Sequence, residues 1–177
     1  MNNLLCRLLL LLFATAAPAL AVGQTDLPDG ILELPAHAAP DSVLDDLDSE
    51  PYDLREDRGS VVFVHFWASW CGPCREEMPA LQRMADTLER EGLRIALINT
   101  AEDEETVFSF LAEHAPRLRP LMDRDGQVTE AWNPRGLPAT FLVDRQGRVR
   151  YQALGGRPWD ELAYLNFLRR LLDEGQP

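Results

Sequence analysis

One segment constrains the fold of this chain more than any other, a run of seven strand-forming residues that leads into a pair of cysteines. The run is VVFVHFW, Val61–Trp67, and its unbroken β-prone composition predicts a strand buried on both faces. Cys71 and Cys74 follow within one short loop, and a helical pattern begins between them at Gly72. This passage from strand to helix predicts an α/β fold with the cysteines at the junction.

The rest of the chain alternates between strand and helix patterns. The first ranges expected in chain order are short edge strands at 31–34 and 52–54, the strand 61–67, a helix at 72–90 that stops at Gly92, and a strand at 93–99. These are followed by a helix from Asp103, a turn at 123–126 and a short helix at 128–132. The last are strands at 139–144 and 148–154 and a helix at 158–172 with Leu162, Leu165 and Leu168 inward. The helix between the two long strands makes them parallel, and the tight turn makes the last two antiparallel. The prediction is a mixed sheet covered by helices.

The first residues have the pattern of an export signal. Met1–Arg7 carries one positive charge, Leu8–Ala17 is apolar apart from Thr15, and small residues lead to Ala21. At 1.5 Å per residue a helix from Leu8 to Val22 would span about 22 Å of a hydrocarbon core about 30 Å thick. We therefore expect cleavage after Ala21, with a retained membrane anchor as the alternative. Cys6 would leave with the signal.

The composition limits the classes of partner. The chain has 29 acidic and 17 basic residues and a net charge of −12. Nucleic-acid binding requires a basic face, so this class is excluded. The acidity is interpreted as keeping the surface soluble. About 155 residues follow the predicted signal, enough for one domain with its own core.

Three roles are open to Cys71 and Cys74: a redox pair, half of a metal site, or a structural staple. A disulfide that closes so short a loop removes little entropy from the unfolded chain, which weakens the third role. A four-ligand zinc site needs two further ligands. After cleavage no other cysteine remains, and His37, His65 and His114 are scattered along the sequence. The spacing therefore favours redox chemistry.

The helix start gives the two sulfurs different roles. Residues three apart in a first helical turn lie on one face, so the sulfurs can meet as a disulfide or separate as thiols. The partial positive charge of a helix N-terminus favours the thiolate of Cys71, which is the attacking species. Cys74 lies one turn further along and is expected to be more buried. Cys71 is thus predicted to attack and Cys74 to resolve the mixed disulfide.

The segment FWASWCGPCREEMPAL resembles the active site of the thioredoxin superfamily in its exported TlpA/ResA/DsbE-like branch. The resemblance extends from about Val61 to the C-terminus and includes DRDGQVTEAW, GLPATFLVDRQGRV, Gly155 and Gly156. It implies a thioredoxin fold, with a mixed central sheet, helices on both faces and short N-terminal edge strands. The domains expected are a signal at 1–21, an acidic segment at 22–57 and a thioredoxin-like domain at 58–177.

The resemblance also implies roles for residues around the cysteines. Trp70 flanks the disulfide and shapes the docking surface, unless it only packs. Gly72 and Pro73 tune the redox potential, and a proline in the first turn loses no hydrogen bond. Pro138 in GLPAT matches the superfamily's cis-proline, which faces the cysteines, although a trans turn proline is the commoner state. Pro79 matches a proline within the family's helix and is expected to kink it.

Three further residues are candidates near the site. Glu77 matches the glutamate of C-x-x-C-x-x-E and is implied to influence thiol ionisation, whereas on pattern alone it is a solvated helix residue. Glu102 corresponds to a second acidic residue of the branch. His65 departs from the family, which has aspartate or asparagine there. It is hypothesised to exchange a proton with Cys74, because imidazole titrates near neutral pH, or else to be a hydrogen-bonded core histidine.

The function predicted is a monomeric, extracytoplasmic thiol-disulfide oxidoreductase, in the periplasm or an equivalent space. It is expected to reduce protein disulfides, with apocytochrome c as the substrate that the family suggests, and to be reduced again by a membrane-bound thiol reductant. No cofactor or metal is expected. The alternatives are a disulfide oxidase, a copper or zinc carrier that uses Cys71, Cys74 and a histidine such as His65, and an inert exported adaptor.

Overall fold

The computed structural model describes residues 27–174. The predicted signal at residues 1–21, with its cleavage site after Ala21, lies outside the described residues.

One mixed sheet forms the centre of the described part of the chain. Its eight strands lie in the order β1-β8-β7-β4-β5-β6-β2-β3. Their bounds are β1 Ile31–Ala38, β2 Val43–Asp46, β3 Pro51–Asp53, β4 Val62–Trp67, β5 Arg94–Thr100, β6 Pro120–Asp123, β7 Ala139–Val143 and β8 Arg148–Leu154. As predicted, β4 is parallel to β5, and β7 is antiparallel to β8.

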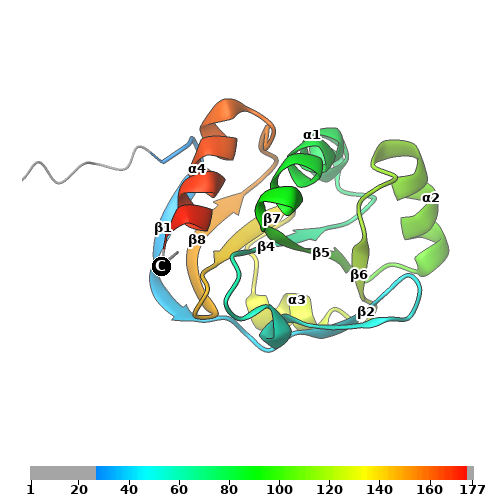
Figure 1. Ribbon diagram of the computed structural model, residues 1–177. Helices are drawn as coiled ribbons and strands as arrows, with labels where there is room; N and C mark the ends of the chain where they lie inside the picture. Colours follow the sequence, from blue (N-terminus) through cyan, green and yellow to red (C-terminus); the bar gives the residue numbers. More distant parts are fainter. Residues whose placement is uncertain (1–26, 175–177) are drawn as a thin grey trace, which may run out of the picture.

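Helices cover both faces of this sheet, as Figure 1 shows. Their bounds are α1 Gly72–Leu88, α2 Glu104–His114, α3 Gln127–Trp132 and α4 Leu162–Asp173, with short 3₁₀ turns η1 Leu54–Asp57 and η2 Glu89–Glu91. In the view of Figure 1, α1, α2 and α4 lie above the sheet, while α3 lies below it. The predicted fold class is confirmed.

Alternation along β4 divides the core between these two faces. Phe63 and Trp67 pack with α1, α2 and α4, whereas Val62, Val64 and Phe66 pack with the layer that contains Trp132 of α3. All six residues of β4 are buried, which agrees with a central strand covered on both sides. The strand predicted at 61–67 is therefore confirmed to within one residue.

The N-terminal strands join both edges of the sheet. β1 pairs with β8, and β2 lies between β3 and β6. The edge strands expected at 31–34 and 52–54 correspond to β1 and β3, but β1 continues to Ala38 after a break in register. Strands β2 and β6 were not predicted from the sequence. Both have four residues, and such short runs give little periodicity to detect.

The prediction for the last helix is partly wrong. The helix begins at Leu162 instead of Pro158, and Leu162 is 72% exposed. Trp159, which precedes the helix, is fully buried instead. The inward face of α4 consists of Tyr164, Phe167, Leu168, Leu171 and Leu172. Leu162 lies about 200° around the helix from Tyr164, because each residue advances the helix by about 100°, so it points away from the buried face.

Helix α1 carries the cysteines at its N-terminus and passes through Pro79. It ends at Leu88, and η2 continues the chain to Gly92. Gly92 has a φ of 101°, a left-handed conformation that favours glycine. The stop predicted at Gly92 is confirmed, although the last turn is 3₁₀.

Candidate active site

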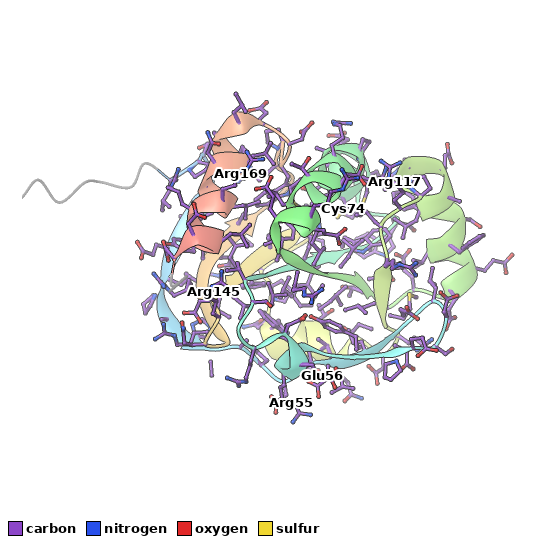
Figure 2. The ribbon with its side chains drawn as sticks, in the orientation of Figure 1. Arg55, Glu56, Cys74, Arg117, Arg145 and Arg169 are labelled. Atoms are coloured by element: carbon purple, nitrogen blue, oxygen red, sulfur yellow. A yellow bond between two sulfur atoms is a disulfide. The ribbon has the colours of Figure 1, made fainter. Side chains whose placement is uncertain are left out.

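Cys71 and Cys74 form a disulfide where β4 passes into α1. Cys71 is the N-cap of the helix, and its Sγ accepts a hydrogen bond from the backbone N–H of Cys74 at 3.3 Å. Figure 2 shows Cys74 on α1. Cys71 is 6% exposed and Cys74 is fully buried. A partner can therefore reach Cys71 first, in the order expected from the sequence.

The charges around the helix N-terminus favour an anionic Cys71 sulfur. The first turn of α1 contains no acidic residue. Its free N–H groups and the helix dipole stabilise negative charge at the N-cap. Arg75 follows directly after Cys74, donates to the carbonyl of Ser69 at 3.2 Å, and lies over the ring of Phe110. The first turn can thus stabilise a thiolate once the disulfide is reduced.

Residues of the predicted docking surface surround Cys71. Trp70 is 69% exposed, and Gly72 and Pro73 are also exposed. The peptide bond between Leu137 and Pro138 is cis. Ala139, the next residue, pairs with Phe66 near the end of β4, so Pro138 lies at the end of the sheet that leads to the cysteines. The cis state implied by the resemblance is confirmed.

Glu77 lies one helical turn after Cys74 and is buried, with 5% of the residue exposed. Its Oε2 accepts hydrogen bonds from the backbone N–H of Arg157 at 3.0 Å and from Nε1 of Trp159 at 3.2 Å. The expectation from pattern alone, a solvated helix residue, is wrong. The loop before α4 covers this position and supplies donors to the carboxylate.

His65 lies on β4, on the face that α1 covers, and is fully buried. Its Nδ1 is 2.8 Å from Oγ1 of Thr140 on β7, and its Nε2 is 3.1 Å from Oε1 of Glu77. The ring also stacks near Phe63. His65 is therefore a hydrogen-bonded core histidine. It also contacts Glu77, which lies on the buried face of α1.

Glu102 holds the loop that precedes Cys71. Its carboxylate accepts from the backbone N–H of Ser69 at 2.7 Å, from the Ser69 hydroxyl, and from Nδ2 of Asn99 at 2.7 Å. Ala101, just before it, has a φ of 56°, an uncommon conformation for alanine. The resemblance suggested an acidic residue near the site, and the structure places it against the active-site loop.

Several residues of the site were not predicted as members of it, namely Ser69, Thr140, Arg157 and Trp159. Gly156 was noticed only as part of the resemblance. A Cβ atom at Gly156 would lie 3.1 Å from the carbonyl oxygen of Pro73, so the loop passes close to the first turn of α1. Trp159 and Asp160 gave no signal of contact with α1, because their partners Glu77 and Arg83 lie 82 and 77 residues away in the sequence.

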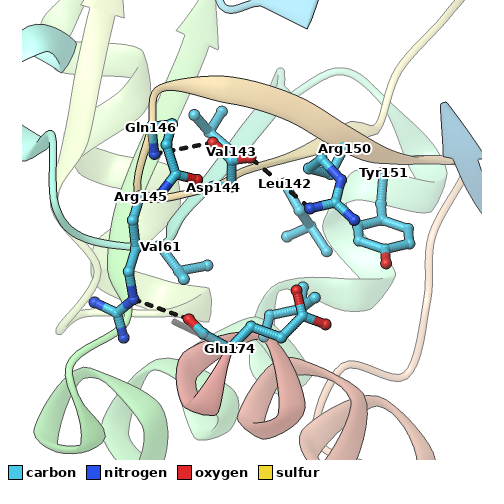
Figure 3. Close-up of a pocket in the computed structure, with 10 residues that line it drawn as sticks. Val61, Leu142, Val143, Asp144, Arg145, Gln146, Arg150, Tyr151 and Glu174 are labelled. Carbon is cyan, nitrogen blue, oxygen red and sulfur yellow. Dashed lines mark hydrogen bonds and ion pairs between the residues drawn. The ribbon is translucent and has the colours of Figure 1, made fainter. Parts of the chain in front are cut away.

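The molecule also has hollows away from the disulfide. A pocket of about 210 Å³ is lined by Val61, Leu142, Arg145, Arg150 and Tyr151, among others (Figure 3). Val61 lies just before β4, whose opposite end leads to Cys71, so this pocket is remote from the disulfide. Arg145 within it donates to carbonyl oxygens of Gly59, Leu172 and Glu174, which gives it a structural role.

Within residues 27–174, no three His, Cys, Asp or Glu side chains are grouped so as to hold a metal ion. In the same part of the chain, no helix is both long and apolar enough to cross a bilayer.

The mixed sheet, the disulfide at the start of α1 and the cis-proline at the adjoining strand define a protein with a thioredoxin fold. A model of the Redoxin family matches residues 35–167, and the chain belongs to this family. It is 35% identical over 138 residues to the thiol-disulfide oxidoreductase ResA of Geobacillus kaustophilus, a match that covers 78% of this chain and 72% of the relative. It is 27% identical over 161 residues to ResA of Bacillus anthracis, with 91% and 93% covered.

Solved structures agree with these sequence relatives. A Chlorobium tepidum protein provisionally assigned as thiol:disulfide interchange protein DsbE superposes with a TM-score of 0.70 at 32% identity, covering 77% of this chain and 96% of that one. The thioredoxin domain of a Bacteroides vulgatus thiol-disulfide oxidoreductase gives a TM-score of 0.66 at 25% identity, covering 78% and 99%. The predicted TlpA/ResA/DsbE-like membership is confirmed, and the enzyme class is thiol-disulfide oxidoreductase.

Proposed function

We propose that this protein reduces disulfides of other proteins through Cys71 and Cys74. The observation that carries the proposal is the position of the two sulfurs: Cys71 caps α1 and is the more exposed, while Cys74 is fully buried behind it. A capping thiolate is stabilised by the helix N-terminus and can be reached by a substrate. A buried second thiol can react only with a disulfide that already includes Cys71.

The proposed reaction has two exchanges. The Cys71 thiolate attacks one sulfur of the substrate disulfide, which forms a mixed disulfide and releases the other substrate sulfur as a thiolate. Cys74 then loses its proton and attacks Sγ of Cys71, which releases the second substrate thiolate. Two electrons pass to the substrate, and the protein ends with the Cys71–Cys74 disulfide that the structure contains.

We assign supporting roles to the residues around the pair. Trp70 and Pro138 form the surface on which the substrate backbone docks, supported by the exposure of Trp70 and the cis peptide bond before Pro138. Gly72 and Pro73 set the geometry of the first turn. Glu77 receives the proton that Cys74 loses, supported by its place one turn away on the buried face of α1.

The setting of the reaction is proposed on the sequence pattern and the resemblance. The signal-like N-terminus supports an extracytoplasmic, periplasm-like location after cleavage at Ala21. An oxidising space returns no electrons, so a membrane-bound thiol reductant is needed to regenerate the enzyme. Likeness to ResA and DsbE supports apocytochrome c as substrate. The protein is proposed to act as a monomer, without a cofactor.

Partner trapping and a redox titration test this function together. Cys74→Ser should accumulate mixed disulfides through Cys71, and Cys71→Ser should accumulate none and lose insulin reduction. Equilibration with glutathione should give a potential nearer to that of thioredoxin, about −270 mV, than to that of DsbA, about −120 mV. A potential at the DsbA end would reverse the direction to oxidation, and equal trapping by both variants would contradict the assigned roles.

A further inference from the structure

The buried pair of His65 and Glu77 is the feature that the thiol chemistry above does not yet explain. Their atoms Nε2 and Oε1 are 3.1 Å apart, and the side chains are 0% and 3% exposed. Neither atom has a hydrogen-bonding partner among residues 27–174 beyond this contact, whose alignment falls short of a regular hydrogen bond. An unsatisfied buried polar atom is destabilising, so a pair of them requires an explanation.

The two oxygens of Glu77 have different surroundings. Oε2 accepts from the backbone N–H of Arg157 and from Nε1 of Trp159, so its acceptor positions are in use. Oε1 faces only the imidazole among the contacts above. A proton that arrives at this carboxylate is therefore bound at Oε1, beside Nε2 of His65.

The opposite side of the imidazole is fixed by a group that suits either tautomer. Nδ1 of His65 is 2.8 Å from the Thr140 hydroxyl, which can donate or accept a hydrogen bond. Nε2 can therefore be a bare acceptor or a protonated donor without a change of ring position. Phe63 stacks on the ring and contacts Trp159 edge-on, which holds the imidazole, Phe63 and the Glu77 donors in one packed unit.

Three elements pack around this pair. Helix α1 carries Cys74, β5 has Leu97 opposite His65, and β7 has Thr140 opposite His65. The Arg157 guanidinium donates to the carbonyls of Leu154 and Gly156 instead of to Glu77. Tyr164 on α4 packs against Trp159, donates to the carbonyl of Asp29, and has its pKa raised by burial.

We propose that His65 is a positioning residue that acts through Glu77, storing the proton that Cys74 releases when it resolves the mixed disulfide; this rests on the function proposed above. Before the transfer the pair is a carboxylate beside a neutral imidazole. The Cys74 thiol gives its proton to Oε1, and the proton passes to Nε2, which leaves a carboxylate beside an imidazolium. The pair then has no net charge, which favours proton uptake in a buried site. The Cys74 thiolate attacks Cys71, and the two electrons leave on the substrate thiolate.

The two exchanges can be timed separately with DTNB, an aromatic disulfide that releases a coloured thiolate. In a stopped-flow reaction of reduced protein, the first coloured thiolate reports attack by Cys71 and the second reports resolution by Cys74. His65→Asn should slow the second release about tenfold near neutral pH, and Glu77→Gln about 100-fold, which is the lower range for general acid–base catalysis. His65→Asn should also flatten the pH profile of the second release and leave the first release unchanged.

Two comparisons separate this role from a structural one. The double variant His65→Asn/Glu77→Gln should be no slower than Glu77→Gln alone, because His65 acts through Glu77. Glu76→Gln and His37→Asn, at exposed positions, are matched controls and should keep both phases. An unchanged second-phase pH profile in His65→Asn, or a double variant whose slowing is the product of the single effects, would overturn the inference.

A measurement on the wild-type protein covers the case in which the variants do not fold. The nitrogen-15 shifts of the His65 ring, followed across pH, should differ between the oxidised and reduced proteins, while those of His37 stay the same. Superimposable His65 curves would also overturn the inference. If instead wild-type protein releases no coloured thiolate, the proposed function itself fails, so the two failures are distinguishable.

Discussion

Trp159 donates its indole N–H to the Glu77 carboxylate at 3.2 Å, although 82 residues separate them in the sequence. Arg157 adds its backbone N–H to the same oxygen at 3.0 Å. The loop before α4 is thereby fixed to the first turns of α1, one turn beyond the disulfide. The same carboxylate therefore holds this loop and lies one helical turn from Cys74.

Replacing Glu77 by alanine should destabilise the oxidised protein by about 2–4 kcal/mol, because it leaves buried donors without an acceptor. Glu77→Gln keeps an acceptor oxygen and should be less destabilising. Urea unfolding of the oxidised proteins measures both changes. Glu76→Ala, at the exposed neighbouring position, is the control, with a change within about 0.5 kcal/mol. Equal effects at the two positions would mean that the loop contact contributes little.

Gly156→Ala should separate the same loop from α1. The new Cβ would lie 3.1 Å from the carbonyl oxygen of Pro73, a backbone atom that cannot move aside easily. We expect a loss of about 1–3 kcal/mol, as for other overpacked positions. Gly136→Ala is the matched control, because a Cβ there meets no atom within 4 Å. Thermal unfolding should show a lower midpoint for Gly156→Ala alone; a wild-type midpoint would show that the loop is free to shift.

Ala101→Gly should stabilise the protein. Alanine at a φ of 56° carries strain of about 1–2 kcal/mol, and glycine relieves it while adding about 0.4–1 kcal/mol of unfolded-state entropy. The expected net gain is about 0.5–1 kcal/mol. Ala112→Gly, at an exposed position inside α2, should lose about 1 kcal/mol. Chemical denaturation checks the opposite signs, and a loss at both positions would refute the strain argument.

Asp144 should make stability depend on acid pH. Burial alone would raise the pKa of this carboxyl, but hydrogen bonds from the Arg148 side chain and backbone and from the Gln146 N–H lower it overall. Because the folded pKa lies below the unfolded value, the stabilisation is present above about pH 4 and is lost as the pH falls through the folded pKa.

The expected result is that Asp144→Asn loses less stability than the wild type on acidification. Urea midpoints measured at neutral pH and again below the unfolded pKa of aspartate give the comparison. Asp41→Asn, at an exposed position, is the control and should retain the wild-type dependence. If Asp144→Asn shows the same acid-induced loss of stability as the wild type, the Asp144 carboxylate does not cause that loss.

Local pattern predicted the parts of the fold that depend on neighbouring residues. The strand around His65, the helix that begins at Gly72 and the antiparallel pair after Pro138 are all recognisable, because long apolar runs, capping residues and tight turns act over a few positions. Strand β6, Pro120–Asp123, was not predicted, because four residues are too few to show a clear alternation of apolar and polar positions. Leu162 was also placed inward, because the spacing of leucines in the sequence does not show which side of the helix meets the sheet.

Local sequence is enough to identify the reactive pair, its position at a helix start and the chemistry that two sulfurs three residues apart can perform. The burial of Glu77, and its contact with His65 from β4, follow from packing in three dimensions. Residue spacing along one helix reports which side chains share a face, but not which distant segment will cover that face. The partners of Glu77 come from a loop about 80 residues away and from another strand, and only the packing of α1 on the sheet brings them together.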